Sequence, residues 1–188
     1  MPISNLIIPS ILKKIRALNL YSEDDVDMMR NSLQAILWET EKMIILFIIF
    51  TLMGQYDYFL VTLAVLVSIR VNAGGYHSGT ALNCLIFTFI MFYLSIIILP
   101  QFPLNTIGIW LISVFSLFAT LLAAPVKSSE RKDIIKTKDS TSKILSLVIT
   151  LFWLTLVYIF QDHSYTDSVL WIIFLQNVQL LFEYFRRR

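Results

Sequence analysis

Charged residues are missing from most of this sequence. No Asp, Glu, Lys or Arg occurs in residues 71–126, 144–161 or 168–182. Only 15% of the 188 residues are charged and 57% are hydrophobic, whereas soluble domains have about 25% charged and about 45–50% apolar residues. Runs of about 20 apolar residues are long enough to cross a bilayer as helices. The missing charge excludes a soluble domain and predicts an all-α fold, a polytopic membrane helical bundle.

Cysteine and histidine are nearly absent. The single cysteine, Cys84, excludes an internal disulfide bond, and the chain has two histidines. Cys84 and His77 are near each other in sequence, but a structural zinc site needs four ligands. The Gly-x-Gly-x-x-Gly fingerprint of dinucleotide sites is missing as well. We therefore expect no metal and no cofactor.

The scarce residue types gather in one place. Residues 70–84 read R-V-N-A-G-G-Y-H-S-G-T-A-L-N-C, and we call them the Gly-His-Cys segment. The segment holds three of the five glycines, one of the two histidines and the cysteine. It lies between two strongly apolar runs. This concentration in an apolar chain indicates a functional site.

Six hydrophobic segments are separated by short turns and one long polar loop, residues 127–143. They are residues 43–53, 58–69, 85–99, 107–124, 144–160 and 169–184. The first two would be only about 18 Å long as helices, whereas a full span needs about 30 Å. Two interpretations of this pair stay open. Either the first helix recruits residues from Ala35 onward and both helices cross, or the pair forms a re-entrant hairpin.

The N-terminal residues have an amphipathic pattern. We expect a surface helix over residues 1–20, with its basic residues mostly off the apolar face. That face carries Ile7, Ile11, Ile15 and Leu18. The helix lies either on anionic lipid or packed against the bundle. Ser22 is a good N-cap for a second helix that runs through Gln34 into the first hydrophobic segment.

We treat the chain as one integral membrane domain, residues 1–188. It has an amphipathic N-terminal region (1–42), a membrane bundle (43–184) and a basic tail (185–188). With the Gly-His-Cys segment, the polar loop and the C-terminus on one side, every Lys and Arg falls on that side. The positive-inside rule then makes both termini and the Gly-His-Cys segment cytoplasmic. Trp110 and Trp171 fall near the outer ends of their spans, as an aromatic belt requires.

The chemistry of the Gly-His-Cys segment depends on a break in the helix. On a continuous helix, His77 and Cys84 would lie about 10 Å apart, whereas proton transfer needs about 3 Å. Gly74 and Gly75 permit the backbone to leave the helix, and a hydroxyl residue before Cys84 can cap a new one. We predict that Cys84 lies in the first turns of that helix. His77 then folds back from the loop as general base to a Cys84 nucleophile.

Neighbouring groups complete the predicted site. A helix N-terminus and an imidazolium both favour the thiolate form of a cysteine, and Arg70 adds positive charge. Amides near the helix start and around Gly74 and Gly75 are candidates for binding an oxyanion. Further polar partners on the same side of the membrane are Gln34, Asn83, Glu39 and Glu183. The simpler interpretation is that the cysteine packs in the bundle and these polar residues lie on solvated faces.

At these residues the chain resembles a known family. Arg70, the run Ala-Gly-Gly-Tyr-His ending at His77, and Cys84 resemble the signature of the accessory gene regulator B (AgrB) family. Its members are polytopic membrane endopeptidases of Gram-positive bacteria. The length, the amphipathic start, the Ala124-Pro125 pair before a basic loop and the basic tail fit this family too.

The resemblance implies a function and a location in the bacterial cell membrane. Such proteins process an AgrD-like precursor peptide into a cyclic autoinducing peptide for quorum sensing. It implies that Cys84 forms a thioester with the precursor, that His77 acts as base and then acid, and that an internal cysteine or serine closes a thiolactone or lactone. It also implies a homodimer in the lipid bilayer, with no nucleic-acid partner.

Two other functions stay open from the residues themselves. A small bundle of this kind is typical of a peptide transporter or export subunit, although the hydrophobic segments lack the ionisable residues that transporters place there. A non-catalytic membrane scaffold is the other alternative.

Overall fold

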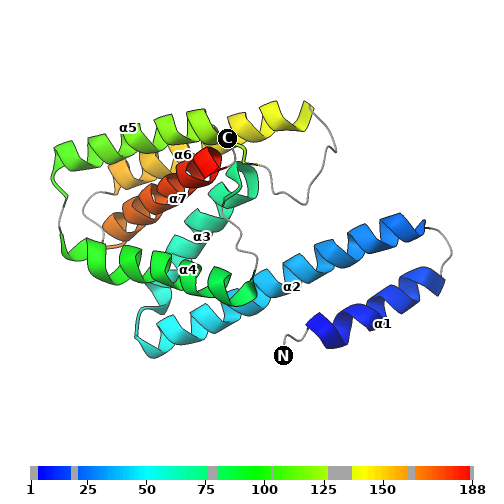
Figure 1. Cartoon of the computed structure of the whole chain (residues 1–188). Coiled ribbons are helices and arrows are strands. Elements are labelled where there is room, and N and C mark those ends of the chain that lie inside the picture. The colour runs from blue at the N-terminus through cyan, green and yellow to red at the C-terminus, as the bar shows by residue number, and fades with distance from the viewer. Residues whose placement is uncertain are drawn as a thin grey trace. The chain divides into compact units, whose positions relative to one another are not determined.

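In the computed structural model of the chain, residues 4–17, 21–75, 80–102, 104–126, 137–160 and 164–186 are described. Regular structure over these residues is entirely helical (Figure 1). Two compact units are present, Met1–Gly54 and Gln55–Arg188. The predicted all-α fold is confirmed.

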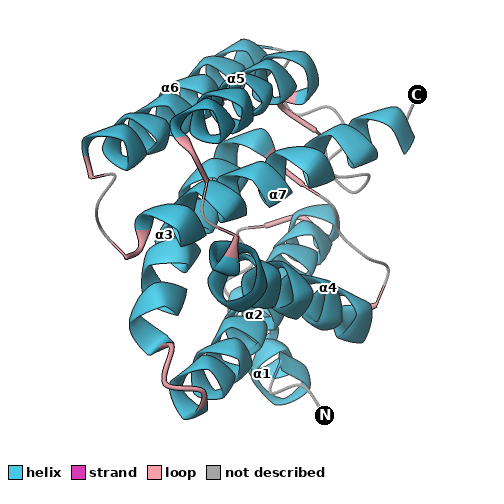
Figure 2. Ribbon diagram, turned by 90° about the vertical axis from the view of Figure 1, so that its left-hand side faces the viewer, coloured by secondary structure: helices cyan, strands magenta, loops and turns pink. Residues whose placement is uncertain are grey.

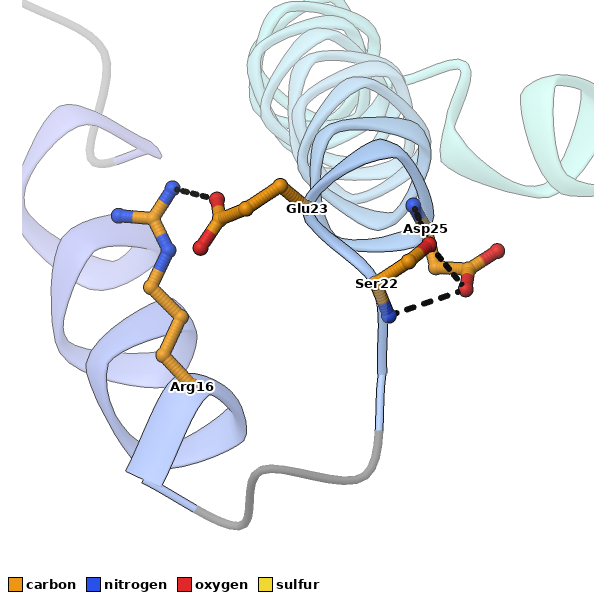
Figure 3. A network of polar contacts seen from close by, with 4 residues as sticks. All are labelled: Arg16, Ser22, Glu23 and Asp25. Carbon is orange, nitrogen blue, oxygen red and sulfur yellow. Dashed lines mark hydrogen bonds and ion pairs between the residues drawn. The ribbon is translucent and has the colours of Figure 1, made fainter.

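The N-terminal unit is a pair of helices, α1 (Ser4–Ala17) and α2 (Glu23–Leu52). Ser22 caps α2 as predicted, because its hydroxyl oxygen accepts the Asp25 N–H while Asp25 accepts the Ser22 N–H, each at 3.2 Å (Figure 3). Arg16 Nη2 lies 2.9 Å from Glu23 Oε2 and joins the end of α1 to the start of α2. The capping box begins α2, and the ion pair links the two helices of this unit.

The fully buried residues of α1 lie next to the predicted apolar face. Ile8 and Leu12 are buried against Val26 of α2, whereas the spacing favoured a face through Ile11 and Ile15. These last two are half-buried and line an apolar groove with methionines of α2, and Ile15 also packs against the buried cluster. The sequence showed that α1 is amphipathic, but the direction in which α2 lies selects the residues that become buried.

The second unit contains the remaining helices. These are α3 (Tyr56–Ala73), α4 (Ala81–Tyr93), α5 (Thr106–Ala123), α6 (Thr137–Ile159) and α7 (Thr166–Arg186). Helix α4 continues as a π-helical turn, Leu94–Ile98, and a 3₁₀ turn, Leu99–Gln101. Within the described residues, five segments are long and apolar enough to cross a membrane, so the chain is a multi-pass membrane protein.

Helix α7 is the central helix of this unit. It packs against α3, α4, α5 and α6 (Figure 2). Of its membrane-length segment 56% is buried within the protein, against 22–33% for the other four spans. The polar residues of α7 are therefore shielded from lipid by neighbouring helices.

Several helix boundaries differ from the sequence prediction. The first of the six predicted segments is the final part of α2, which runs unbroken through Ala35 but is not among the five candidate spans. Helix α3 extends past Arg70 to Ala73, and α6 begins at Thr137 within the predicted polar loop. A helix extends for as long as its backbone N–H and C=O groups form hydrogen bonds. In these helices the bonding continues beyond the last apolar side chain.

The two ends of the second unit have different chemistry. At one end, the Tyr165 hydroxyl donates to Asp57 Oδ2 at 3.0 Å, and Trp110 lies 5.5 Å from Tyr158 between ring centroids. At the other end lie the last turn of α3, the first turn of α4 and Val126, the third residue after α5. The aromatic groups and the Gly-His-Cys segment therefore lie at opposite ends of the spans.

The contact between Tyr165 and Asp57 predicts a pH-dependent effect. Hydrogen bonding to the Asp57 carboxylate raises the pKa of Tyr165 above its usual value of 10.0. Stabilisation from the neutral phenol is therefore complete below about pH 10 and is lost as the pH rises through the higher value. We expect Tyr165→Phe to lower the Tm at pH 7 by less than about 4 °C. Thermal unfolding in detergent should show the two proteins converging at more alkaline pH, and a difference that widens there would contradict this assignment.

Candidate active site

Cys84 is the fourth residue of α4. The N-cap is Thr80, whose carbonyl accepts the Cys84 N–H at 3.1 Å. The Thr88 hydroxyl donates to the Cys84 carbonyl at 2.8 Å, and the side chain of Cys84 is half-buried. The predicted location of Cys84, in the first turns of a helix that follows the glycines, is confirmed.

The start of α4 provides positive electrostatic potential next to this thiol. Amide N–H groups in the first turn of a helix have no acceptor within the helix, and the helix dipole adds to their effect. The Asn83 N–H donates to the Thr80 hydroxyl oxygen at 3.4 Å. The amides of Ala81 and Leu82, the first two residues of α4, belong to the same first turn. Such a turn can stabilise a thiolate and an oxyanion that forms near it.

Gly74 fixes the start of the loop between α3 and α4. It is the C-cap of α3, with φ 79°, and its N–H donates to the Arg70 carbonyl at 2.9 Å. The Val126 N–H donates to the Ala73 carbonyl at 2.9 Å, so Gly74 lies beside Val126, three residues beyond the end of α5. A Cβ at Gly74 would lie closer to the Val126 carbonyl oxygen than real side chains come. Both its backbone conformation and this close approach require glycine.

Gly75 is enclosed by nitrogen atoms from two helices. A Cβ added there would lie 3.1 Å from Arg70 Nε, 3.4 Å from Gln176 Nε2 and 3.5 Å from Gln179 Nε2. Gln176 Nε2 donates to the Gly74 carbonyl at 3.0 Å. The structure therefore brings three predicted supporting residues, Arg70, Gly74 and Gly75, together and adds two glutamines of α7.

The remaining predicted residues are His77, Gln34, Glu39 and Glu183. His77 and residues 127–136 of the basic loop are outside the described residues. Gln34 and Glu39 belong to α2 in the N-terminal unit. Gln34 lines a groove beside Arg30, and Glu39 Oε2 lies 2.6 Å from Lys42 Nζ. Glu183 is buried in α7, with Oε1 2.8 Å from Arg186 Nη2.

Sequence reasoning missed Gln176 and Gln179, although a signal was present. They lie three residues apart in an otherwise apolar segment, and Glu183 follows four residues later. This spacing places all three on one face of a helix, and all three are buried. Among the described residues, no group of three or more His, Cys, Asp or Glu side chains gathers as a metal site would require.

Comparison with known proteins agrees with these features. The family model described as accessory gene regulator B matches residues 4–180. An AgrB-like protein of Clostridium beijerinckii is 33% identical over 161 residues, which cover 85% of this chain and 79% of that protein. AgrB-like protein 1 of Clostridium perfringens (strain 13 / Type A) is 29% identical over 181 residues, which cover 89% and 93%. No solved structure matches the chain. The match over nearly the whole chain, together with the multi-pass helices and the Gly-His-Cys segment, shows that this protein belongs to the accessory gene regulator B (AgrB) family.

Proposed function

We propose that this protein is a membrane-embedded cysteine endopeptidase that cleaves and cyclises an AgrD-like precursor peptide. The observation that carries the proposal is the location of Cys84. It lies in the first turn of α4, directly after a glycine loop whose start is bonded to α7 and to Val126. A nucleophile at a helix N-terminus, reached from a loop that contains a histidine, is a recurring arrangement for thiol catalysis.

The reaction uses His77 and Cys84 in two half-reactions. His77 takes the proton from Cys84 Sγ, which attacks the carbonyl carbon of the scissile peptide bond. The amides that begin α4 stabilise the resulting oxyanion. His77 then gives its proton to the departing amine, and the C-terminal fragment leaves. The product of this half-reaction is a thioester between Cys84 and the precursor.

A second nucleophile closes the ring. The thiol or hydroxyl of a cysteine or serine within the bound precursor loses its proton to His77 and attacks the thioester carbonyl. The Cys84–acyl bond breaks, Cys84 regains a proton, and a thiolactone or lactone is released. Attack from within the same chain has a high effective concentration, which favours cyclisation over hydrolysis by water.

The location and partners of the enzyme follow from the same proposal. The positive-inside rule supports a cytoplasmic Gly-His-Cys segment and cytoplasmic termini, and the five candidate spans support insertion in the bilayer. Precursor and enzyme then meet at the cytoplasmic face of the membrane. A homodimer rests on family resemblance alone.

Thiol labelling tests this proposal without knowledge of the substrate. At neutral pH an ordinary cysteine is only a few per cent thiolate. We expect iodoacetamide to alkylate Cys84 rapidly in the full-length protein, and His77→Ala to slow the reaction by about 10-fold or more. The rates can be followed by intact mass, with Cys84→Ala as the unlabelled control. Slow labelling that is equal with and without His77 would favour a packing cysteine in a scaffold.

A further inference from the structure

One face of α7 changes from apolar to polar along its length. Val169, Ile172, Gln176, Gln179 and Glu183 are spaced by three or four residues and share one side of the helix. All five side chains are buried. Polar groups within membrane helices are costly, and they commonly mark functional sites. The polar half of this face, from Gln176 onward, therefore needs an explanation beyond packing.

The change occurs where the Gly-His-Cys segment leaves α3. Gln176 Nε2 donates to the Gly74 carbonyl at 3.0 Å. Gln176 and Gln179 also place their Nε2 atoms 3.4 Å and 3.5 Å from the position of a Cβ on Gly75. Gln176 thus holds the start of the loop from the α7 side, and both glutamine amides lie beside the next residue, Gly75.

Gln176 differs from the buried amide next to it. Asn177 Nδ2 donates to the Ile173 carbonyl of its own helix at 2.9 Å, and its Oδ1 accepts from the Thr120 hydroxyl at 2.7 Å. Asn177 therefore joins α7 to α5. Gln176 instead uses its N–H on the loop, while its Oε1 is buried with no hydrogen-bond partner among the described residues. A buried oxygen without a hydrogen-bond partner costs free energy. The hydrogen bond that the Nε2 group donates to the loop is therefore the best explanation for a glutamine at this position.

We propose that Gln176 is a positioning residue for the peptidase reaction. By holding the Gly74 carbonyl, it sets the direction in which the chain enters the loop. His77 follows Gly74 by three residues, which span at most about 11 Å, so an anchored Gly74 limits the positions that His77 can take relative to Cys84. Gln179 lies beside the same loop on the next turn of α7. The inference rests on the proposed function, because it takes His77 as the base.

A double-mutant cycle on Cys84 labelling tests this role in the full-length protein. Gln176→Met keeps a similar volume and removes the N–H donor. We expect it to lower the iodoacetamide rate by about 5- to 10-fold, which is the usual effect of one lost hydrogen bond, and to shift the rate profile to higher pH. In a His77→Ala background the same change should have less than about a 2-fold effect, because Gln176 acts through His77.

Asn177→Leu is the matched control on the same helix. The Thr120 hydroxyl keeps the Ser116 carbonyl as an acceptor at 2.9 Å, so the contact between helices is weakened without an orphaned donor. We expect this variant to lower the Tm and leave the labelling rate unchanged. If Gln176→Met does not fold, Gln176→Leu replaces it, since leucine is a slightly smaller apolar side chain that also lacks the donor.

The outcomes separate this inference from the proposed function. A labelling rate that does not depend on His77 in the unmodified protein overturns the proposed function. Labelling that depends on His77 but is unaffected by Gln176→Met overturns the positioning role alone. Equal slowing by Gln176→Met with and without His77 also overturns it, because the effect then bypasses the histidine.

Discussion

Replacing Cys84 with Ala is expected to abolish cleavage of a co-expressed precursor peptide, with a loss of at least about 10³-fold. Removal of a nucleophile typically leaves only the contributions of binding and of the oxyanion site. The change removes one sulfur atom from a half-buried position, so the fold should survive. Cleavage is measured by mass spectrometry of the precursor in membranes of the expressing cells, with protein amount checked by immunoblot.

Two further variants of α4 serve as controls for Cys84→Ala. Ile86→Ala changes an exposed side chain on the same helix and should leave cleavage intact. Cys84→Ser keeps a weaker nucleophile in nearly the same shape and should retain at most traces of activity. Undiminished cleavage by Cys84→Ala would remove the basis for a cysteine peptidase. Transport of intact peptide by that variant would favour the export function.

Replacing Gly74 with Ala is expected to cause the second large effect. The φ of 79° disfavours any residue with a Cβ, and the added methyl group would meet the Val126 carbonyl oxygen. Backbone strain of this kind costs of order 1–3 kcal/mol, and relief of the contact must move the loop or the chain after α5. We expect a loss of activity of at least about 10-fold and a lower Tm.

Gly54 offers a matched comparison for Gly74. It has a similar φ of 71°, but an added Cβ would meet no atom within 4 Å. Gly54→Ala therefore has only the conformational cost of a positive φ, about 1 kcal/mol, and no clash. The Gly54→Ala protein should keep its peptidase activity. The difference between the two variants, in precursor cleavage and in thermal unfolding, reports the contact with Val126 together with the added strain of the ψ of −160° at Gly74. Equal behaviour would show that this contact does not matter.

Much of the fold could be predicted because its signals are local. Ser22 followed by Asp25 marks the start of α2, and residues 71–126 lack any charge that would interrupt a membrane span. A hydroxyl residue between the Gly74-Gly75 pair and Cys84 predicts that a new helix begins before Cys84. Thr80 is that N-cap in the structure. Each signal depends on a few adjacent residues, so one sequence is enough to show it.

Helix ends and buried faces were harder to predict. Arg70 resembled the end of a helix because the apolar run stops there, yet α3 continues to Ala73. In α1, Ile8 and Leu12 are fully buried while the predicted Ile15 is only partly buried beside them, since the position of α2 selects which side of an amphipathic helix becomes buried. These properties depend on neighbours that are distant along the chain.

By itself, the sequence determined that this protein is a multi-pass helical membrane protein with a Gly-His-Cys segment of the AgrB type. Periodicity, missing charge and residue spacing are properties of the chain alone. Only the tertiary structure decided what supports that segment. Gln176 is 102 residues from Gly74 along the chain, and Val126 reaches Ala73 only because α3 and α5 end at the same level. Hydrogen bonds between such distant residues form when helices pack, and no local pattern encodes their partners.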